Sequence, residues 1–192
     1  MIIPGGFGVR GSEGKMIAAD FARENNIPYL GLCFGFQLAI VSFARFACGL
    51  SGANSSELES NSPHPVIDLL PEQKRIKNMG ATMRLGGIDV NIVEDTLAHR
   101  LYDSSQIRER HRHRYEFNQK YTDIFRENGM IFSGSSDNGK RMEILEIPSH
   151  PFFVAVQYHP EFLSRPGFPE PVFEGLVSAA IDRHNSKIQR DS

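Results

Sequence analysis

The sequence predicts an α/β fold, with a three-layer, mostly parallel sheet flanked by helices. Three observations predict it: short apolar strands alternate with segments of helical period, glycine-rich turns join them, and strand signals return near the end of the chain. With 192 residues, 40% of them hydrophobic, the chain is long enough for one domain with its own core.

The first part of the chain alternates strand and helix, the order that is typical of a parallel sheet. The expected elements are a strand end at 1–3, a glycine-rich turn at 4–11, a helix at 12–25, a strand at 28–32 and a helix at 35–47. We expect Ser12 to be the N-cap of the first helix and Gly49 to end the second.

The remainder of the chain predicts strands and three further helices. The expected strands are 82–85, 88–93, 130–133, 141–147 and 152–158, and the expected helices are 96–102, 119–127 and 173–188. Asn138-Gly139 predicts a hairpin, because this pair favours the positive φ angles of a type I′ turn. Apolar residues at 173, 176, 177, 180 and 181 predict that the last helix is amphipathic and covers the sheet.

Charge and targeting signals exclude several classes of protein. Lys and Arg total 21 against 23 for Asp and Glu, a net charge of −2, which argues against binding nucleic acid through phosphate contacts. No apolar run approaches the roughly 20 residues of a membrane-spanning helix, and the N-terminus lacks the features of a signal peptide. Two cysteines make a poor disulfide framework, so we expect a reducing, cytoplasmic location.

The strongest local motif is Gly31-Leu32-Cys33-Phe34-Gly35, which has the form Gly-x-Cys-x-Gly between a strand and a helix. This is the thiol counterpart of the nucleophile elbow of hydrolases. The glycines allow a sharp turn and leave room for substrate, and the helix start places positive partial charge beside the sulfur, which favours the thiolate. The alternative is a buried cysteine with a structural role.

A thiolate nucleophile needs a base, and His159 is the best of seven histidines. It follows an apolar strand and is expected at the carboxyl end of the sheet, where α/β proteins assemble their sites. Glu161 lies two residues further on, across a proline, where it can orient the imidazole as the third member of a triad. Alternatively, the His-Pro pair forms an ordinary turn and Glu161 is a surface residue.

The glycine-rich turn at residues 4–8 presents backbone N–H groups that can bind an anion. In this setting the anion is the tetrahedral oxyanion that forms when sulfur attacks a carbonyl. The competing interpretation is a phosphate-binding loop, but the turn lacks the Gly-Lys-Ser/Thr pattern of that motif.

The basic run 108–116 has three interpretations. It resembles a nucleic-acid-binding segment, which the net charge disfavours, or a metal site through His111 and His113, for which the sequence offers no third ligand of suitable spacing. The alternating charges favour an extended segment with two faces, one serving a substrate carboxylate and the other an anionic effector.

Taken in order, the Pro-Gly-Gly turn, Gly-x-Cys-x-Gly and His-Pro-Glu resemble the class I (triad) glutamine amidotransferases. Further blocks resemble one branch of that family, whose glutaminase domain supplies ammonia to a synthetase domain that aminates ATP-activated UTP. These blocks are 4–11, 53–57, 83–86, 109–116, 141–143 and 156–162. The resemblance covers nearly the whole chain.

The resemblance implies a role for each matching residue. Cys33 is the nucleophile, His159 the general base and then acid, and Glu161 the residue that orients the imidazole. The N–H groups of Gly6 and Phe34 form the oxyanion hole. The implied substrate-binding residues are Gly6, Phe34, Gly35, Phe36, Gln37, Glu57 and Arg114. Glutamine is a zwitterion, so Glu57 suits its α-ammonium and Arg114 its α-carboxylate.

The resemblance also implies partners and boundaries. L-Glutamine is the substrate, and the synthetase domain of the same polypeptide, which binds ATP and Mg, is the partner. GTP is the implied activator, with Arg10 and Arg112 as candidate contacts, and the full enzyme is a homo-oligomer, a tetramer. No cofactor or metal is expected in this domain. Residues 1–192 form a single glutaminase domain that lacks its first strand and helix and the upstream synthetase domain, so we expect an unpaired strand edge and exposed apolar faces.

The sequence departs from the family pattern at Phe34 and Phe36, where leucine and methionine are more usual, and we expect a reshaped pocket. Two other functions stay open. One is the glutaminase of another amidotransferase, such as GMP synthetase or carbamoyl-phosphate synthetase. The other is a truncated, non-catalytic module that docks to a synthetase.

Overall fold

The computed structural model describes residues 1–69 and 83–191. Its strands are β1 (Ile2–Ile3), β2 (Tyr29–Leu32), β3 (Ala53–Ser55), β4 (His64–Asp68), β5 (Arg84–Ile92), β6 (Gln106–His113), β7 (Glu116–Phe117), β8 (Ile131–Ser136), β9 (Arg141–Glu146) and β10 (Phe153–Val156). Its helices are α1 (Ser12–Glu24), α2 (Phe34–Phe46), α4 (Leu97–Tyr102), η2 (Gln119–Tyr121), α5 (Thr122–Glu127), η3 (Pro160–Phe162) and α6 (Pro171–Asp191). The predicted alternation of strand and helix at the start of the chain is confirmed.

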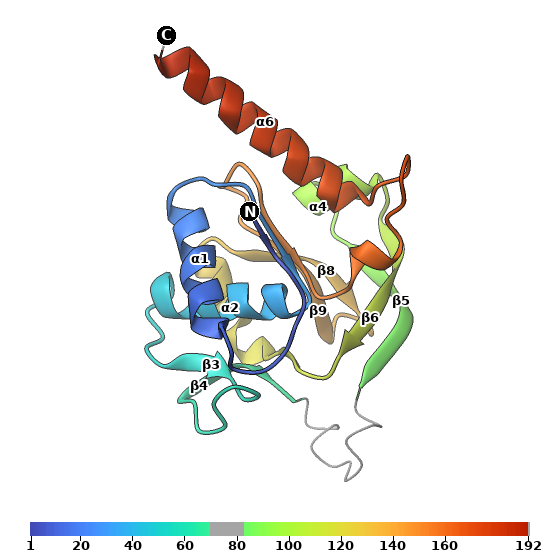
Figure 1. The fold of residues 1–192 in the computed structure, drawn as a ribbon. Helices are drawn as coiled ribbons and strands as arrows, with labels where there is room; N and C mark the ends of the chain where they lie inside the picture. Colours follow the sequence, from blue (N-terminus) through green and yellow to red (C-terminus); the bar gives the residue numbers. More distant parts are fainter. Residues whose placement is uncertain (70–82, 192) are drawn as a thin grey trace.

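The main sheet has seven strands in the order β1-β2-β10-β9-β8-β5-β6 (Figure 1). Only β1, β2 and β10 pair in parallel, whereas the other four pairings are antiparallel, so the sheet is mixed and the prediction of a mostly parallel sheet is wrong. The reason lies in the connections. A parallel pair needs a crossover of a dozen or more residues, and the short links from β8 to β9 and from β9 to β10 permit only antiparallel neighbours. A second sheet has the order β3-β4-β7.

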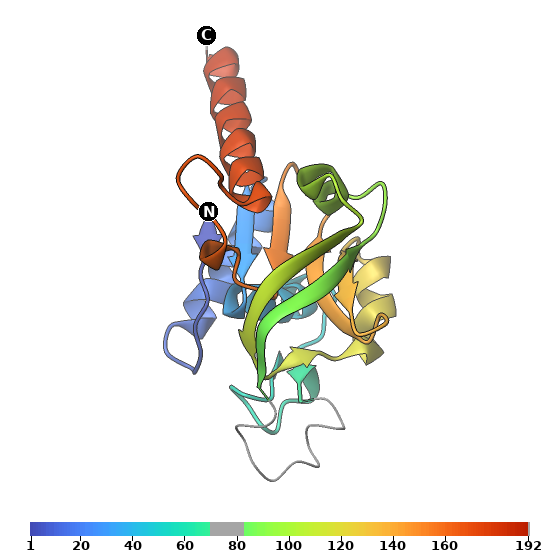
Figure 2. The same cartoon turned by 90° about the vertical axis from the view of Figure 1, so that its right-hand side faces the viewer.

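Both faces of the main sheet are buried, which makes the fold three-layered. In β10, Phe153 and Ala155 belong to one apolar cluster, and Val154 and Val156 belong to the other. This alternation follows from the period of two in a strand. Helices α1 and α2 cover the first cluster, while α4 and the start of α6 cover the second, as two perpendicular views show (Figures 1 and 2).

Several local predictions are confirmed. The predicted helix at 96–102 is α4, with the N–H of His99 donating to Thr96 Oγ1 at 3.1 Å, and the helix predicted at 119–127 is formed by η2 and α5. The hairpin is present between β8 and β9, with Asn138 at φ 56° and Gly139 at φ 81°. These positive angles are those that an Asn-Gly pair adopts readily.

Two predictions are corrected. Ser12 is not the N-cap but the first residue of α1: Gly11 is the cap, at φ 75°, and the Ser12 hydroxyl donates to the Val9 carbonyl. Segments 82–85 and 88–93 are not two paired strands, because β5 runs through both and pairs along its length with β6; residue 82 lies outside the described residues. The glycines in β5 do not make a turn. A Cβ at Gly87 would lie 3.1 Å from Nε of Arg108, so this glycine makes room for the neighbouring side chain.

Helix α6 is only partly packed on the sheet, which corrects the prediction that it covers it. Val172 and Leu176 are buried in the second cluster, whereas Val177 and Ile181 are 57% and 53% exposed. The buried face is therefore rotated by about one residue from the predicted stripe, and the rest of the helix projects beyond the sheet (Figures 1 and 2). Within the described part of the chain, no helix combines the length and apolarity that crossing a membrane requires.

Candidate active site

Cys33 lies on a strained turn between β2 and α2. Its backbone has φ 49° and ψ −99°, a conformation that costs of order 1–3 kcal/mol for a residue with a side chain. A Cβ at Gly31 would lie 2.8 Å from the Gly35 carbonyl oxygen, and a Cβ at Gly35 would lie 2.1 Å from the carbonyl oxygen of Ile3. The glycines therefore let β1, β2 and the start of α2 pack against one another. We also expected these glycines to leave room for substrate, but the space beside them is filled by the protein's own atoms.

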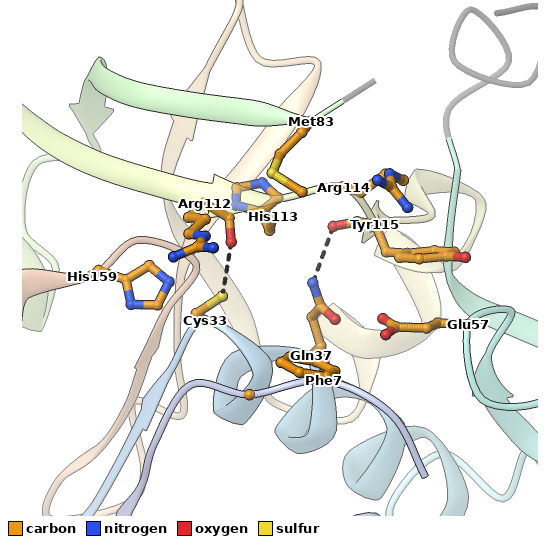
Figure 3. Close-up of a pocket in the computed structure, with 11 residues that line it drawn as sticks. Phe7, Cys33, Gln37, Glu57, Met83, Arg112, His113, Arg114, Tyr115 and His159 are labelled. Atoms are coloured by element: carbon orange, nitrogen blue, oxygen red, sulfur yellow. Dashed lines mark hydrogen bonds between the residues drawn. The ribbon is translucent and has the colours of Figure 1, made fainter. Parts of the chain in front are cut away.

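His159 lies directly beside the thiol. Gly5 adjoins both residues, because a Cβ built on it would be 3.0 Å from Cε1 of His159 and 3.7 Å from Cβ of Cys33. The backbone N–H of His159 donates to the Arg110 carbonyl at 2.9 Å, and the Cys33 thiol donates to the Arg112 carbonyl at 3.7 Å (Figure 3). Strand β6 therefore holds both residues through its main chain.

Glu161 completes the triad geometry that the sequence predicts. Its Oε1 lies 2.6 Å from Nδ1 of His159, which leaves Nε2 as the ring nitrogen for the chemistry at sulfur. The interactions with Cys33 and then with Glu161 raise the pKa of His159 from 6.5 to about 10, despite burial, which lowers it. Burial raises the pKa of Glu161, but the hydrogen bond from His159 outweighs it, and the net direction is down. The pair therefore favours an imidazolium beside a carboxylate.

Replacing Glu161 with glutamine should lower the pKa of His159, because the ring loses a hydrogen bond and a negative charge. Because this pKa is raised above 6.5, the stability from the bound proton is fully present below pH 6.5 and is lost as the pH rises towards 10. The E161Q variant should move that loss to lower pH and slow a reaction at the Cys33 sulfur that needs His159 as base or acid, on the order of 100-fold. A titration of the imidazole by NMR measures the pKa.

Glu174→Gln, at an exposed glutamate of α6, is the matched control and should leave the titration of His159 unchanged. An unaltered His159 pKa in the E161Q variant would show that Glu161 does not act on the ring.

The triad opens into a cavity of about 540 Å³. Its lining residues come from the glycine-rich turn, from the turn before α2 and its first turn, from the loop after β3, from the residue before β5, from the end of β6 and the bend after it, and from the loop after β10 (Figure 3). They are Gly6, Phe7, Cys33, Gln37, Glu57, Met83, Arg112, His113, Arg114, Tyr115 and His159. A cavity of this size admits a small metabolite, and both signs of charge are present in its wall.

Four of the seven predicted substrate-binding residues line this cavity: Gly6, Gln37, Glu57 and Arg114. Gln37 Nε2 donates to the Tyr115 carbonyl at 3.1 Å and to Oε1 of Gln157 at 3.1 Å, so its amide is held in place. The N–H of Gly8 donates to Oε1 of Glu57 at 3.3 Å, which fixes that carboxylate against the glycine-rich turn.

The other three, Phe34, Gly35 and Phe36, are not among the lining residues. The rings of Phe34 and Phe36 are buried in the first apolar cluster, and Gly35 packs on Ile3. We expected the two phenylalanines to reshape the pocket, and this prediction is wrong, because neither side chain lines the cavity. Both side chains lie in the core because α2 is buried on all sides from Phe34 to Ala44.

The backbone of Gly6 and Phe34 stays available for the predicted oxyanion hole. Phe34 is the first residue of α2, and the first N–H groups of a helix have no acceptor within it. A Cβ at Gly6 would lie 3.5 Å from Cδ1 of Phe34, so the glycine-rich turn and the helix start adjoin each other.

Sequence reasoning missed several lining residues, among them Phe7, Met83, His113 and Tyr115. Phe7 carried a signal, since a large apolar residue inside a glycine-rich turn is out of place unless it faces a ligand; it is 87% exposed. Arg112, an expected effector contact, also lines the cavity, and Arg10 is exposed.

Strand β6 has the two faces that its alternating sequence predicts. Arg108, Arg110 and Arg112 are exposed, whereas the residues between them are buried. The buried His111 and His113 do have a possible third metal ligand, which corrects the sequence analysis: Glu143 of β9 brings an oxygen within 4.8 Å of their ring nitrogens. However, Glu143 Oε1 already accepts from Arg84 at 2.6 Å, and this neighbouring cation opposes a metal ion.

Comparisons with known proteins agree with this site. The family described as "Glutamine amidotransferase class-I" matches residues 1–179, so the chain belongs to the class I glutamine amidotransferases. The chain is 59% identical over 181 residues to the CTP synthase of Archaeoglobus fulgidus, and 54% identical over 187 residues to that of Staphylococcus saprophyticus. These alignments cover 94% and 97% of this chain but 34% and 35% of the relatives, so the chain spans about a third of their length.

Solved structures give the same result. The glutaminase domain of Trypanosoma brucei CTPS, which contains bound acivicin, superposes with a TM-score of 0.89 at 43% identity, covering 94% of this chain and 70% of that one. A Thermoplasma acidophilum protein described as a GMP synthase subunit matches with a TM-score of 0.58 at 16% identity, covering 98% of this chain and 75% of that one. The second likeness shows only the fold. The predicted resemblance of this chain to the glutaminase domain of CTP synthases is therefore confirmed.

Proposed function

We propose that this chain hydrolyses L-glutamine to glutamate and ammonia, and that the ammonia aminates UTP to CTP in a synthetase domain of the same polypeptide. One observation carries the proposal: Cys33 and His159, whose ring is bonded to Glu161, line the same cavity as Glu57 and Arg114. A nucleophile and a recognition site for a zwitterion are thus combined in one cavity.

The proposed chemistry begins when the Cys33 thiolate attacks the side-chain amide carbon of glutamine. The carbonyl oxygen becomes an oxyanion, which the N–H groups of Gly6 and Phe34 stabilise. His159 gives its Nε2 proton to the departing nitrogen, so ammonia leaves and a thioester forms. Water, deprotonated by His159, then attacks the thioester, which releases glutamate and returns the proton to the thiol.

Specificity for glutamine follows from the charges around the nucleophile. The Glu57 carboxylate suits the α-ammonium, and the planar guanidinium of Arg114 can bind the α-carboxylate through two hydrogen bonds. Gln37 is held by Tyr115 and Gln157 at the floor of the cavity, where it limits the orientation of the substrate.

The rest of the proposed reaction lies outside this chain. We assign ATP and Mg to the synthetase domain and infer activation of the glutaminase by GTP, with Arg112, which lines the cavity, and the exposed Arg10 as candidate contacts. We also infer that residues upstream of Met1 in the full-length polypeptide cover the outer edge of β1, where Ile2 is 47% exposed.

The test uses the full-length polypeptide that contains this domain. With glutamine, UTP and ATP–Mg, we expect glutamate and CTP to form in equal amounts, and ammonium chloride should replace glutamine for CTP formation. GTP should accelerate glutamate release. CTP formation from ammonium alone, with no glutamate released from glutamine, would identify a non-catalytic module instead. Amination of XMP rather than UTP would identify the GMP synthetase alternative.

A further inference from the structure

The chain passes from one sheet to the other beside the active site. Strand β6 ends at His113 in the seven-stranded sheet, and β7 begins at Glu116 in the three-stranded sheet. The two residues between these strands, Arg114 and Tyr115, both line the cavity. Contacts that fix this two-residue bend therefore also fix where the Arg114 guanidinium lies in the cavity wall.

Glu116 closes the bend from its buried side. Its side chain is 1% exposed, and its Oε1 accepts from Nε2 of His113 at 3.1 Å, so one contact spans the whole bend. On the cavity side, the amide of Gln37 donates to the Tyr115 carbonyl at 3.1 Å. The bend is thus tethered on both of its sides.

Two arginines connect Glu116 to the rest of the main sheet. Arg84, at the start of β5, donates to Oε1 at 3.3 Å, and Arg141, at the start of β9, donates to the same oxygen at 3.0 Å. Both guanidinium groups are mostly buried, with side chains 11% and 14% exposed. The carboxylate is therefore a junction of β5, β6, β7 and β9.

The charge state of Glu116 is set by these neighbours. Burial alone would raise the pKa of its carboxyl, but His113, Arg84 and Arg141 outweigh burial and lower it. The group is therefore ionised. Removing one member of a buried, hydrogen-bonded ion cluster leaves the others uncompensated, so neutralising Glu116 should displace its partners rather than leave them in place.

Glu143, a second buried carboxylate of the same cluster, offers an internal comparison. Its side chain is 0% exposed, and it accepts from Arg84 at 2.6 Å and from the Ser136 hydroxyl. These two hydrogen bonds join β5 to the β8–β9 hairpin and do not involve residues 114 or 115. The two glutamates share burial and an arginine partner, but only Glu116 spans the bend.

We propose that Glu116 is a positioning residue: it holds the Arg114–Tyr115 bend in the geometry that binds the α-carboxylate of glutamine. The proposal rests on the glutaminase function proposed above. The ionised carboxylate of Glu116 lies on the buried side of the bend that carries Arg114, so it acts on substrate binding and not on the reacting atoms. Loss of the charge should therefore affect the KM for glutamine more than kcat.

The test compares Glu116→Gln with Glu143→Gln in the full-length polypeptide. For E116Q we expect the KM for glutamine to rise about tenfold or more, while kcat changes less than about threefold and alkylation of Cys33 by neutral iodoacetamide keeps its rate. For E143Q we expect a comparable loss of Tm with an unaltered KM. Arg141→Gln, which removes one of three donors to Glu116, should give an intermediate rise in KM.

Each outcome has a separate meaning. Equal effects of E116Q and E143Q on KM and kcat would overturn the proposal, since both residues would then only stabilise the fold. If E116Q does not fold, Arg141→Gln decides: an unaltered KM in that variant overturns the proposal, and a raised KM at unaltered kcat supports it. A wild-type enzyme that releases no glutamate would instead overturn the proposed function, independently of these variants.

Discussion

Replacing Cys33 with alanine should abolish glutamine hydrolysis, with a loss of about 10⁴-fold or more. In the proposed mechanism the Cys33 sulfur forms the covalent intermediate, and removing a nucleophile from a triad removes most of the catalysis that the triad provides. An electrophilic analogue of glutamine should add its mass to the wild-type chain at Cys33 and should leave the C33A variant unlabelled. Mass spectrometry of the intact and digested protein measures this directly.

The chain supplies its own control in Cys48. This second cysteine is half-buried, donates to the Ile124 carbonyl, and has a pKa raised by burial to about 11. A thiol with so high a pKa is mostly protonated and unreactive at neutral pH. Cys48→Ala should therefore keep both hydrolysis and labelling. Labelling of Cys48 in the wild type, or none in a folded protein, would contradict the assignment of Cys33.

Replacing Glu57 with alanine should lower kcat/KM for glutamine on the order of 100-fold, because it removes the charged hydrogen bond that we assign to the α-ammonium. Alkylation of Cys33 by neutral iodoacetamide should change less than about threefold, since that reagent carries no ammonium group. The comparison of steady-state kinetics with the rate of alkylation separates recognition of the zwitterion from reactivity of the sulfur.

Glu59→Ala is the matched control for this prediction. Glu59 lies two residues from Glu57, is exposed, and is not one of the residues that line the cavity. It should leave both rates unchanged. If E57A slows hydrolysis and alkylation by the same factor, then Glu57 supports the structure of the cavity and does not recognise the substrate.

The triad was predictable because each of its members carries a local signal. Cys33 lies between two glycines at a strand–helix junction, and His159 and Glu161 flank a proline directly after an apolar strand. The buried ion cluster gives no such signal. Glu116 meets Arg84 across 32 residues and Arg141 across 25, and no periodicity connects these positions. Contacts of this kind depend on the tertiary arrangement and become visible only in the structure.

The fold was predictable in its elements more than in its pairings. Period and composition identify a strand, but they do not say which neighbour it has or in which direction that neighbour runs. Hence the strand regions near β8, β9 and β10 were correct while the mostly parallel sheet was not. Segments 82–85 and 88–93 were predicted as two strands because the sequence does not show that Gly87 makes room for the Arg108 side chain within one continuous strand.

The hydrogen bonds between the main chain of β6 and the residues Cys33 and His159 have an evolutionary consequence. His159 and Cys33 are both bonded to carbonyl oxygens of this strand, those of Arg110 and Arg112. Every amino acid offers the same carbonyl, so the outward side chain at position 110 can mutate without loosening either bond. Evolution can therefore substitute the exposed side chain at position 110, and with it the binding properties of the surface near Cys33, while the main-chain hydrogen bonds that hold Cys33 and His159 are retained.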